Sequence, residues 1–198
     1  MFVKAPRPGL AKTRIAQTAG QTRAAAIHRE LVDAILNGIG ALSAVELRFT
    51  PDDAEAEIQA WVRDNWLAKP QGSGDLGARL ARAFDESFAS GAERVVIIGS
   101  DCPEVRPSDV RSAWTGLKTH DVVVGPAIDG GYWLIGLRAS QPALFEGITW
   151  SSDQVLGQTL QRARSLGLRI QLLRILGDID TEADWNAYVR QRKESSAP

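Results

Sequence analysis
The amino-acid sequence predicts an α/β fold of three layers, with helices on both faces of a mostly parallel sheet. Two observations lead to this prediction. Short apolar segments alternate along the chain with longer segments whose apolar residues recur every three to four positions. Neither a linker nor a repeat nor a low-complexity tract interrupts this alternation. We therefore expect one domain over residues 1–192, followed by a frayed tail over residues 193–198.

The first half of the chain begins with a short strand at residues 1–4 and a long helix at residues 22–39. The apolar residues of this helix share one face: Ala24, Ile27, Leu31, Ile35 and Ile39. A strand at residues 45–50 follows. Two helices are expected next, at residues 54–66 and 76–88, because their apolar residues recur at helical spacing.

The second half continues with a buried strand at residues 94–99 and a helix at residues 108–118, for which Pro107 is a start signal. Strands at residues 121–125 and 132–137 are joined by a short Gly-rich segment. We expect one edge region of the sheet to be antiparallel here or to carry a crossing hairpin, because a parallel connection needs a longer crossover. The last expected elements are a helix at 153–166, a strand at 168–173 and a helix at 182–191.

Composition bounds the class of protein. The 198 residues are 44% hydrophobic and 24% charged, which is ordinary for a globular protein and excludes wholesale disorder. The apolar runs fall far short of the roughly 20 residues that a membrane span needs. The single cysteine, Cys102, excludes an intrachain disulfide and a cysteine-based zinc cluster. A net charge of −1 gives no general affinity for nucleic acid. We expect a cytoplasmic protein, and the oligomeric state is left open.

A basic loop follows the first expected strand, at the carboxyl edge where parallel sheets bind ligands. Residues 1–29 contain basic residues and no acidic one. Within the loop, prolines stiffen the chain and Gly9 allows close backbone approach to a ligand. Lys12 and Arg14 are suited to neutralising a phosphate chain. The loop is no P-loop, since Pro6 and Ala11 stand where that motif needs glycines; the alternative is a solvated basic loop.

A glycine loop, Gln71-Gly-Ser-Gly-Asp-Leu-Gly77, precedes the helix expected at residues 76–88. It contains a G-x-G-x-x-G pattern, but it lies mid-chain and not after the first strand, which argues against a Rossmann dinucleotide site. Backbone N–H groups at the start of the helix are suited to contacting a nucleotide. The alternative is an ordinary loop with Asp75 as helix cap.

Carboxylates lie where two other strands end. Asp101 directly follows the buried strand at residues 94–99, and Asp178 and Asp180 follow the strand at residues 168–173. Oxygen ligands at such a position suit Mg²⁺ or Mn²⁺, so we expect Asp101 and Asp180 to share one divalent ion. The alternative is that these aspartates are turn and cap residues, since Thr181 and Asp184 have the spacing of a near capping box.

A glycine-aromatic hairpin, Gly125-Pro-Ala-Ile-Asp-Gly-Gly-Tyr-Trp133, joins the paired strands. Asp129 is polar among apolar strands, and the two aromatic residues are able to wall a pocket or stack on a ring. The alternative is a plain Asp-Gly turn. Taken together, the basic loop, the glycine loop, the carboxylates and this hairpin are the parts of a site for a nucleoside di- or triphosphate with a divalent metal.

These motifs occur in an order that resembles a known family. The motifs are Lys4-Ala-Pro-x-Pro-Gly-x-x-Lys-Thr-Arg14, Gln71-Gly-x-Gly-Asp-Leu-Gly77, Gly99-x-Asp-Cys-Pro103, Gly125-Pro-x-x-Asp-Gly-Gly-Tyr132 and Asp178-x-Asp-Thr-x-x-Asp184. The resemblance spans nearly the whole chain and is to a bacterial family of unknown function, usually labelled glycosyltransferase and often linked to radical-SAM or selenoprotein clusters. This family is similar to the nucleotide-diphospho-sugar transferases of the glycosyltransferase-A fold, whose relatives include the molybdenum cofactor and phospholactate guanylyltransferases.

The resemblance implies a role for each motif residue. Phosphate and nucleotide contacts fall to Lys4, Pro8, Gly9, Lys12, Arg14, Gln71, Gly72, Gly74, Asp75 and Gly77. The acceptor side falls to Asp129, Gly130, Gly131 and Tyr132, the metal to Asp101 and Asp180, and catalysis to Asp129 and Lys12. The first strand is expected to be short, because only three residues precede Lys4.

The resulting expectation is a transferase that depends on Mg²⁺ or Mn²⁺, with a nucleotide-sugar or nucleoside triphosphate donor and a small-molecule acceptor. There are three alternatives to this function. They are a nucleotidyltransferase of the guanylyltransferase type, a nucleotide-binding module without turnover, and a plain interaction domain. Asp101 is followed by Cys-Pro where sugar transferases typically have Asp-x-Asp, and this difference favours nucleotidyl transfer.

Overall fold
The fold is that of a computed structural model, which describes residues 1–195. Its strands are β1 (Phe2–Lys4), β2 (Glu46–Thr50), β3 (Leu67–Pro70), β4 (Val95–Ile98), β5 (Val122–Pro126), β6 (Tyr132–Leu137) and β7 (Ile170–Leu172). Its α-helices are α1 (Thr13–Ala19), α2 (Gln21–Ile39), α3 (Glu55–Ile58), α4 (Leu76–Ala89), α5 (Pro107–Gly116), α6 (Val155–Ser165) and α7 (Glu182–Ser195). Short 3-10 helices are η1 (Gln59–Trp61) and η2 (Pro142–Phe145).

The strands form two sheets within residues 1–195. One contains β1, β2 and β3, all parallel, and the other has the order β4-β6-β5-β7. In the second sheet β6 runs antiparallel to both β4 and β5, whereas β5 and β7 are parallel. The pairing of β5 with β6 confirms the expected antiparallel pair. The connection over residues 127–131 is long enough for a hairpin and too short for the crossover that parallel strands need. This pair lies inside the sheet and not at its edge.

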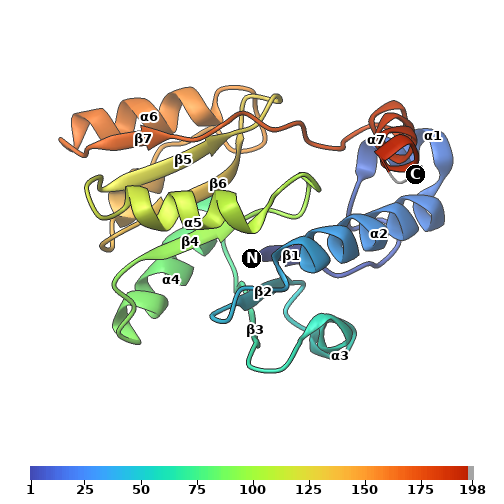
Figure 1. Cartoon of the computed structure of the whole chain (residues 1–198), viewed down its shortest axis with the longest axis horizontal. Helices are drawn as coiled ribbons and strands as arrows, with labels where there is room; N and C mark the ends of the chain where they lie inside the picture. Colours follow the sequence, from blue (N-terminus) through green and yellow to red (C-terminus); the bar gives the residue numbers. More distant parts are fainter. Residues whose placement is uncertain (196–198) are drawn as a thin grey trace.

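Helices cover both faces of the strands, which confirms the α/β class and the three layers (Figure 1). On one face α2 and α5 pack with Leu47, Phe49 and Leu134 in one hydrophobic cluster. On the other face α4, η2 and α6 pack with Ile97, Val124 and Ile135 in a second cluster. A third cluster joins α1, α2 and α7 at the end of the molecule where the last helix lies beside the first.

Three elements differ from the sequence prediction. The helix expected at residues 54–66 ends at Ile58, continues as η1 to Trp61, and then gives way to a turn in which Asn65 is left-handed at φ 67°. That turn leads into β3, which the sequence did not predict because its residues are exposed or half-buried and include Lys69 and Pro70. The unpredicted helix α1 follows the basic loop.

The last helix extends further than expected. α7 continues to Ser195, past the predicted domain end at residue 192, while residues 196–198 of the predicted frayed tail lie outside the described residues. Among the helices of the described part of the chain, none has the length and apolar character needed to span a membrane.

Candidate functional site
Three segments that are far apart in sequence meet beyond the strand ends. They are the basic loop after β1, the turn after β4, and the extended segment 173–181 after β7. Backbone hydrogen bonds connect the segment after β7 to its neighbours: Leu176 N donates to Pro126 O, at the end of β5, at 3.1 Å, and Ile179 N donates to Asp101 O, in the turn after β4, at 2.9 Å. The fold therefore brings Asp101 and Asp180 to one place, although they lie far apart in the sequence.

Lys12 lies at the centre of this junction. Its side chain is only 3% exposed, and its ammonium donates to Asp101 Oδ1 and to Ile179 O. Asp180 Oδ1 lies 3.6 Å from the same nitrogen. A buried cation needs such partners, because removing an ammonium from water is unfavourable unless charges and hydrogen bonds replace the water. Lys12 thus joins all three segments through one side chain.

Arg14 contacts the same carboxylate from the solvent side. Its Nη1 lies 3.0 Å from Asp180 Oδ2, and its side chain is 68% exposed. The structure therefore brings together four residues that the sequence analysis assigned to phosphate and metal: Lys12, Arg14, Asp101 and Asp180. Whether Asp101 and Asp180 bind one shared ion stays a prediction.

Asp101 is held ionised. Partial burial acts to raise the pKa of its carboxyl, but the Lys12 ammonium outweighs this effect and the pKa lies below its ordinary value. The adjacent Cys102 is buried, and burial raises the pKa of its thiol, as expected for a packed residue.

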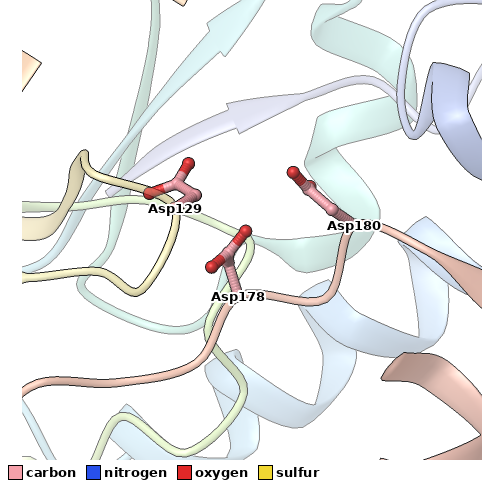
Figure 2. Close-up of side chains that lie close together, drawn as sticks. All are labelled: Asp129, Asp178 and Asp180. Atoms are coloured by element: carbon pink, nitrogen blue, oxygen red, sulfur yellow. The ribbon is translucent and has the colours of Figure 1, made fainter. Parts of the chain in front are cut away.

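A carboxylate cluster adjoins this ion pair. Asp129 comes from the β5–β6 hairpin, and Asp178 and Asp180 come from the segment after β7; the three side chains approach one another in Figure 2. Each offers one oxygen atom, and these atoms all lie within 4.8 Å of one another. Burial and the Asp129 charge raise the pKa of Asp178 to about 6. Three carboxylate oxygens at this spacing are donors that suit a hard divalent cation such as Mg²⁺ or Mn²⁺.

The sequence analysis identified Asp129 and Asp178 as motif residues but did not predict this cluster. It assigned Asp129 to the acceptor side and gave Asp178 no role. One signal in the sequence pointed to part of this cluster: side chains alternate in an extended segment, so Asp178 and Asp180 lie on the same side. The approach of Asp129 depends on how the hairpin bends: Asp129 Oδ1 accepts a hydrogen bond from Gly131 N at 2.8 Å.

The glycine loop is held by side chains that the sequence analysis missed. Arg82 donates to Gln71 O at 2.6 Å and to Ser73 O at 2.9 Å, and Arg79 donates to Gly74 O at 2.9 Å. Both arginines lie on α4, one and two turns beyond Asp75, on the face towards the loop. Because their guanidinium groups bind three carbonyls, the loop has a fixed conformation before any ligand arrives.

Within the glycine loop, the predicted residues have different roles. Asp75 caps α4, with its Oδ1 accepting from Ala78 N at 2.9 Å. Gly72 and Gly74 have positive φ of 77° and 102°, which explains the glycines there. Gln71 is buried and donates to Val3 O and Arg48 O, so its side chain ties β1 to β2 and does not point into solvent.

Three other predicted residues, Gly77, Tyr132 and Gly130, lie in packed surroundings. A Cβ at Gly77 would lie 2.8 Å from Trp150 Nε1, so this glycine permits close packing of α4. The Tyr132 hydroxyl is buried, which raises its pKa, and the partly buried ring packs against the second hydrophobic cluster. Its assignment to the acceptor side stays a prediction. Gly130 also serves packing, since a Cβ there would lie 2.2 Å from Asp153 O.

The tip of the basic loop is exposed. Pro8 and Gly9 at the tip are exposed, and Gly9 has a positive φ of 85°. Lys4, at the end of β1, is exposed as well. Arg7 anchors the loop by ion pairs to Asp53 and Glu57 at 2.9 and 3.0 Å. The loop is therefore fixed at Arg7 and Lys12 and presents its tip to solvent between them.

Comparison with known proteins identifies the family. Residues 40–152, more than half of the chain, match the family described as "Uncharacterized protein conserved in bacteria (DUF2064)". The chain belongs to this family. This finding agrees with the resemblance to a bacterial family of unknown function that the motifs indicated.

Relatives of this DUF2064 chain include two guanylyltransferases. A 3-phospho-D-glycerate guanylyltransferase from Phenylobacterium zucineum is 29% identical over 151 residues, in a match that covers 71% of this chain and 67% of the relative. A phosphoenolpyruvate guanylyltransferase from Sphaerobacter thermophilus is 28% identical over 191 residues, in a match that covers 92% of this chain and 88% of the relative.

A crystal structure from Desulfovibrio desulfuricans G20 has the same fold. It is of a protein assigned to the nucleotide-diphospho-sugar transferases, with 36% identity and a TM-score of 0.90. The match covers 98% of this chain and 87% of that one. The DUF2064 chain therefore has the fold of the nucleotide-diphospho-sugar transferases, as the resemblance predicted.

Proposed function
We propose that this protein is a nucleotidyltransferase of the guanylyl type, which transfers the nucleoside monophosphate group of a triphosphate to a small acceptor. One observation carries the proposal. The cations of Lys12 and Arg14 and the carboxylates of Asp101, Asp178 and Asp180 lie together beyond the strand ends. Phosphate-binding cations beside metal-binding carboxylates are the groups that phosphoryl chemistry needs.

In the proposed reaction an acceptor oxygen forms a bond to the α-phosphorus, and the bond from that phosphorus to the bridging oxygen of the β-phosphate breaks. The electron pair leaves with pyrophosphate. Lys12 and Arg14 neutralise the growing charge on the phosphate oxygens, Lys12 as a point charge and Arg14 as a fork. The glycine loop, fixed by Arg79 and Arg82, contacts the base and ribose without having to be ordered first.

A divalent ion, Mg²⁺ or Mn²⁺, belongs to this proposal. The carboxylates of Asp129, Asp178 and Asp180 would hold it, with Asp101 as a further ligand beside Asp180. Bound there, the ion would neutralise the phosphates and stabilise the departing pyrophosphate. The raised pKa of Asp178 supports this assignment, because the three carboxylates repel one another until a cation joins them.

Sugar transfer is the second candidate, favoured by the 36% identical structure assigned to the nucleotide-diphospho-sugar transferases. It requires deprotonation of an acceptor hydroxyl, for which Asp129 is the exposed carboxylate on the acceptor side. The two candidates differ in the leaving group: pyrophosphate in nucleotidyl transfer and a nucleoside diphosphate in sugar transfer.

The test is a product assay with Mg²⁺ or Mn²⁺. The protein is incubated with each nucleoside triphosphate, or with nucleotide sugars, and a panel of acceptors headed by 3-phosphoglycerate and phosphoenolpyruvate, the substrates named for the relatives. We expect pyrophosphate release from GTP and an acceptor–guanosine product detected by mass spectrometry. Release of a nucleoside diphosphate from a nucleotide sugar, with no pyrophosphate from any triphosphate, would decide for sugar transfer.

Variants in the same product assay test whether the reaction depends on Asp101. Asp101→Asn is expected to lower turnover at least a hundredfold while leaving the fold intact. Asp64→Asn is the matched control, because Asp64 is exposed and lies before β3, away from the three converging segments. Equal activity of both variants would show that Asp101 has no part in the reaction.

The cytoplasmic location and the link to radical-SAM or selenoprotein clusters stay predictions.

A further inference from the structure
The Lys12 ammonium has the surroundings of a bound metal ion. Its partners are the Asp101 carboxylate, the Ile179 carbonyl and, at 3.6 Å, the Asp180 carboxylate. Carboxylate and backbone carbonyl oxygens are the donors that a hard divalent ion takes in proteins. The side chain is also 3% exposed, although the neighbouring tip of its loop is exposed. The nitrogen thus lies in a prepared oxygen site and not in solvent.

A divalent ion and this ammonium are not able to occupy the space between Asp101 and Asp180 together. Like charges a few ångströms apart repel strongly where water is excluded. Arg14 does not compete in this way, because it contacts the outer oxygen of Asp180 and is largely in solvent. Of the two cations beside Asp180, Lys12 alone fills the position that a bridging ion would need.

We propose that Lys12 is an exchangeable resident cation: in the nucleotide-free protein its ammonium occupies the position between Asp101 and Asp180 and excludes a divalent ion from it. A divalent ion reaches this pair only after the ammonium leaves. The inference rests on the proposed function for the partner that draws the ammonium away, the nucleotide phosphates. Lys12 carries its charge on a flexible four-carbon stem, which allows the nitrogen to change partners while the backbone stays in place.

This exchange sets an order of binding. Metal alone meets a pair of carboxylates that is already neutralised, so it binds there poorly. Once phosphates hold the ammonium, Asp101 and Asp180 become available, and the metal gains phosphate oxygens as well. Any factor by which nucleotide strengthens metal binding must equal the factor by which metal strengthens nucleotide binding.

The test uses Mn²⁺ alone, so its outcome does not depend on whether the protein turns over a nucleotide. Free Mn²⁺ is measured by electron paramagnetic resonance during titration of the wild type and of Lys12→Met, which keeps an unbranched side chain one heavy atom shorter and removes the charged ammonium. We expect Lys12→Met to bind Mn²⁺ at least tenfold more tightly than the wild type. Circular dichroism establishes that the variant is folded, and Lys12→Gln, whose amide is able to donate to Ile179 O, replaces it if it is not.

Two controls separate exchange from a general change in charge. Arg14→Met removes a cation from the same Asp180 carboxylate, and we expect it to tighten Mn²⁺ binding less than threefold. Lys118→Met removes an exposed lysine after α5 and is expected to change nothing. Equal gains for Lys12→Met and Arg14→Met would overturn the proposal, since a general charge effect would then explain both. An unchanged affinity in Lys12→Met would overturn it too.

Asp101→Asn gives a second readout that a merely structural lysine would not produce. In the wild-type background Asp101 binds Lys12, so Asp101→Asn is expected to leave the affinity for Mn²⁺ alone nearly unchanged. In the Lys12→Met background the same change is expected to abolish the tenfold gain. A gain that persists in the double variant would show that Mn²⁺ does not use Asp101, and the exchange would be wrong.

Discussion
At the scale of single residues, the negative charge of Asp178 lowers the free energy of unfolding at neutral pH. Partial burial and the nearby Asp129 raise its pKa to about 6, above the ordinary value near 4. The folded protein therefore holds the Asp178 proton more tightly than the unfolded chain does. The resulting contribution to stability is fully present below about pH 4 and is lost as the pH rises through about 6. A bound cation would remove this penalty.

Asp178→Asn tests this directly, because the amide resembles the protonated acid. In EDTA at pH 7.5 we expect the variant to be more stable than the wild type by on the order of 1 kcal/mol, a value that allows for solvent screening of a half-buried group. At pH 4 the two proteins should unfold alike. Adding Mn²⁺ together with a non-hydrolysable GTP analogue should raise the melting temperature of the wild type more than that of the variant. A variant less stable than the wild type at pH 7.5 would contradict the account.

The contribution of Asp109 to the stability of the fold has the opposite pH dependence to that of Asp178. The hydrogen-bonded Arg174 guanidinium lowers the pKa of its carboxyl, and Asp109 Oδ2 also accepts from Arg106 N at 2.8 Å to cap α5. Its contribution is present above the unfolded pKa near 4 and is lost as the pH falls through the lower folded pKa. We expect Asp109→Ala to cost about 1–3 kcal/mol at pH 7, measured by urea unfolding, with Asp64→Ala as the control. A cost that did not shrink in acid would argue against the ion pair.

At the scale of elements, the packing of α4 against η2 depends on Gly77. A Cβ at this position would lie 2.8 Å from Trp150 Nε1 and 2.9 Å from Phe145 O, a backbone atom. Gly77→Ala is therefore expected to destabilise the protein by about 1–3 kcal/mol. Gly157→Ala in α6 is the matched control: a Cβ there would meet nothing within 4 Å, and alanine favours the helix by about 0.5–1 kcal/mol. Thermal unfolding should shift in opposite directions for the two variants.

Elements with a clear apolar period were predictable, and β3 and α3 show why others were not. The buried face of α2 follows directly from the spacing of Ile27, Leu31 and Ile35. Ile58 and Trp61 also have a helical spacing, three residues apart, and are buried, yet the helix ends between them, because the chain turns at Asn65 to bring β3 beside β2. That pairing uses backbone hydrogen bonds, which leave no apolar pattern in a four-residue strand.

The site shows the same limit at the level of side chains. The sequence indicates which residues carry the chemistry, since strand ends, charges and glycines mark Lys12, Asp101 and Asp180. It does not indicate which of them bind each other. Lys12 was assigned to phosphate and Asp101 to metal, whereas the structure pairs the two. A contact between residues so distant in the chain depends on how three loops fold together, and local patterns do not encode it.

At the scale of the whole molecule, a nucleotide with metal should connect segments that are distant in sequence. Hydrogen exchange with and without a non-hydrolysable GTP analogue and Mn²⁺ is expected to show protection in residues 5–14, 72–77, 99–103 and 177–181. The end of α6 that is distant from the site, with the loop before β7, should not change. Protection confined to the cavity of about 220 Å³ lined by Ile39, Arg48 and Trp114 would place the ligand elsewhere.

The most direct test of the central claim is a crystal structure of the protein with Mn²⁺ and guanosine β,γ-methylene triphosphate. We predict an anomalous Mn²⁺ peak about 2.0–2.3 Å from an Asp180 oxygen and from an oxygen of Asp101 or Asp178. The triphosphate should bridge that ion and the ammonium of Lys12, with the base at the glycine loop. A nucleotide bound away from Lys12, or a Mn²⁺ peak that no carboxylate of Asp101, Asp178 or Asp180 contacts, would contradict the account.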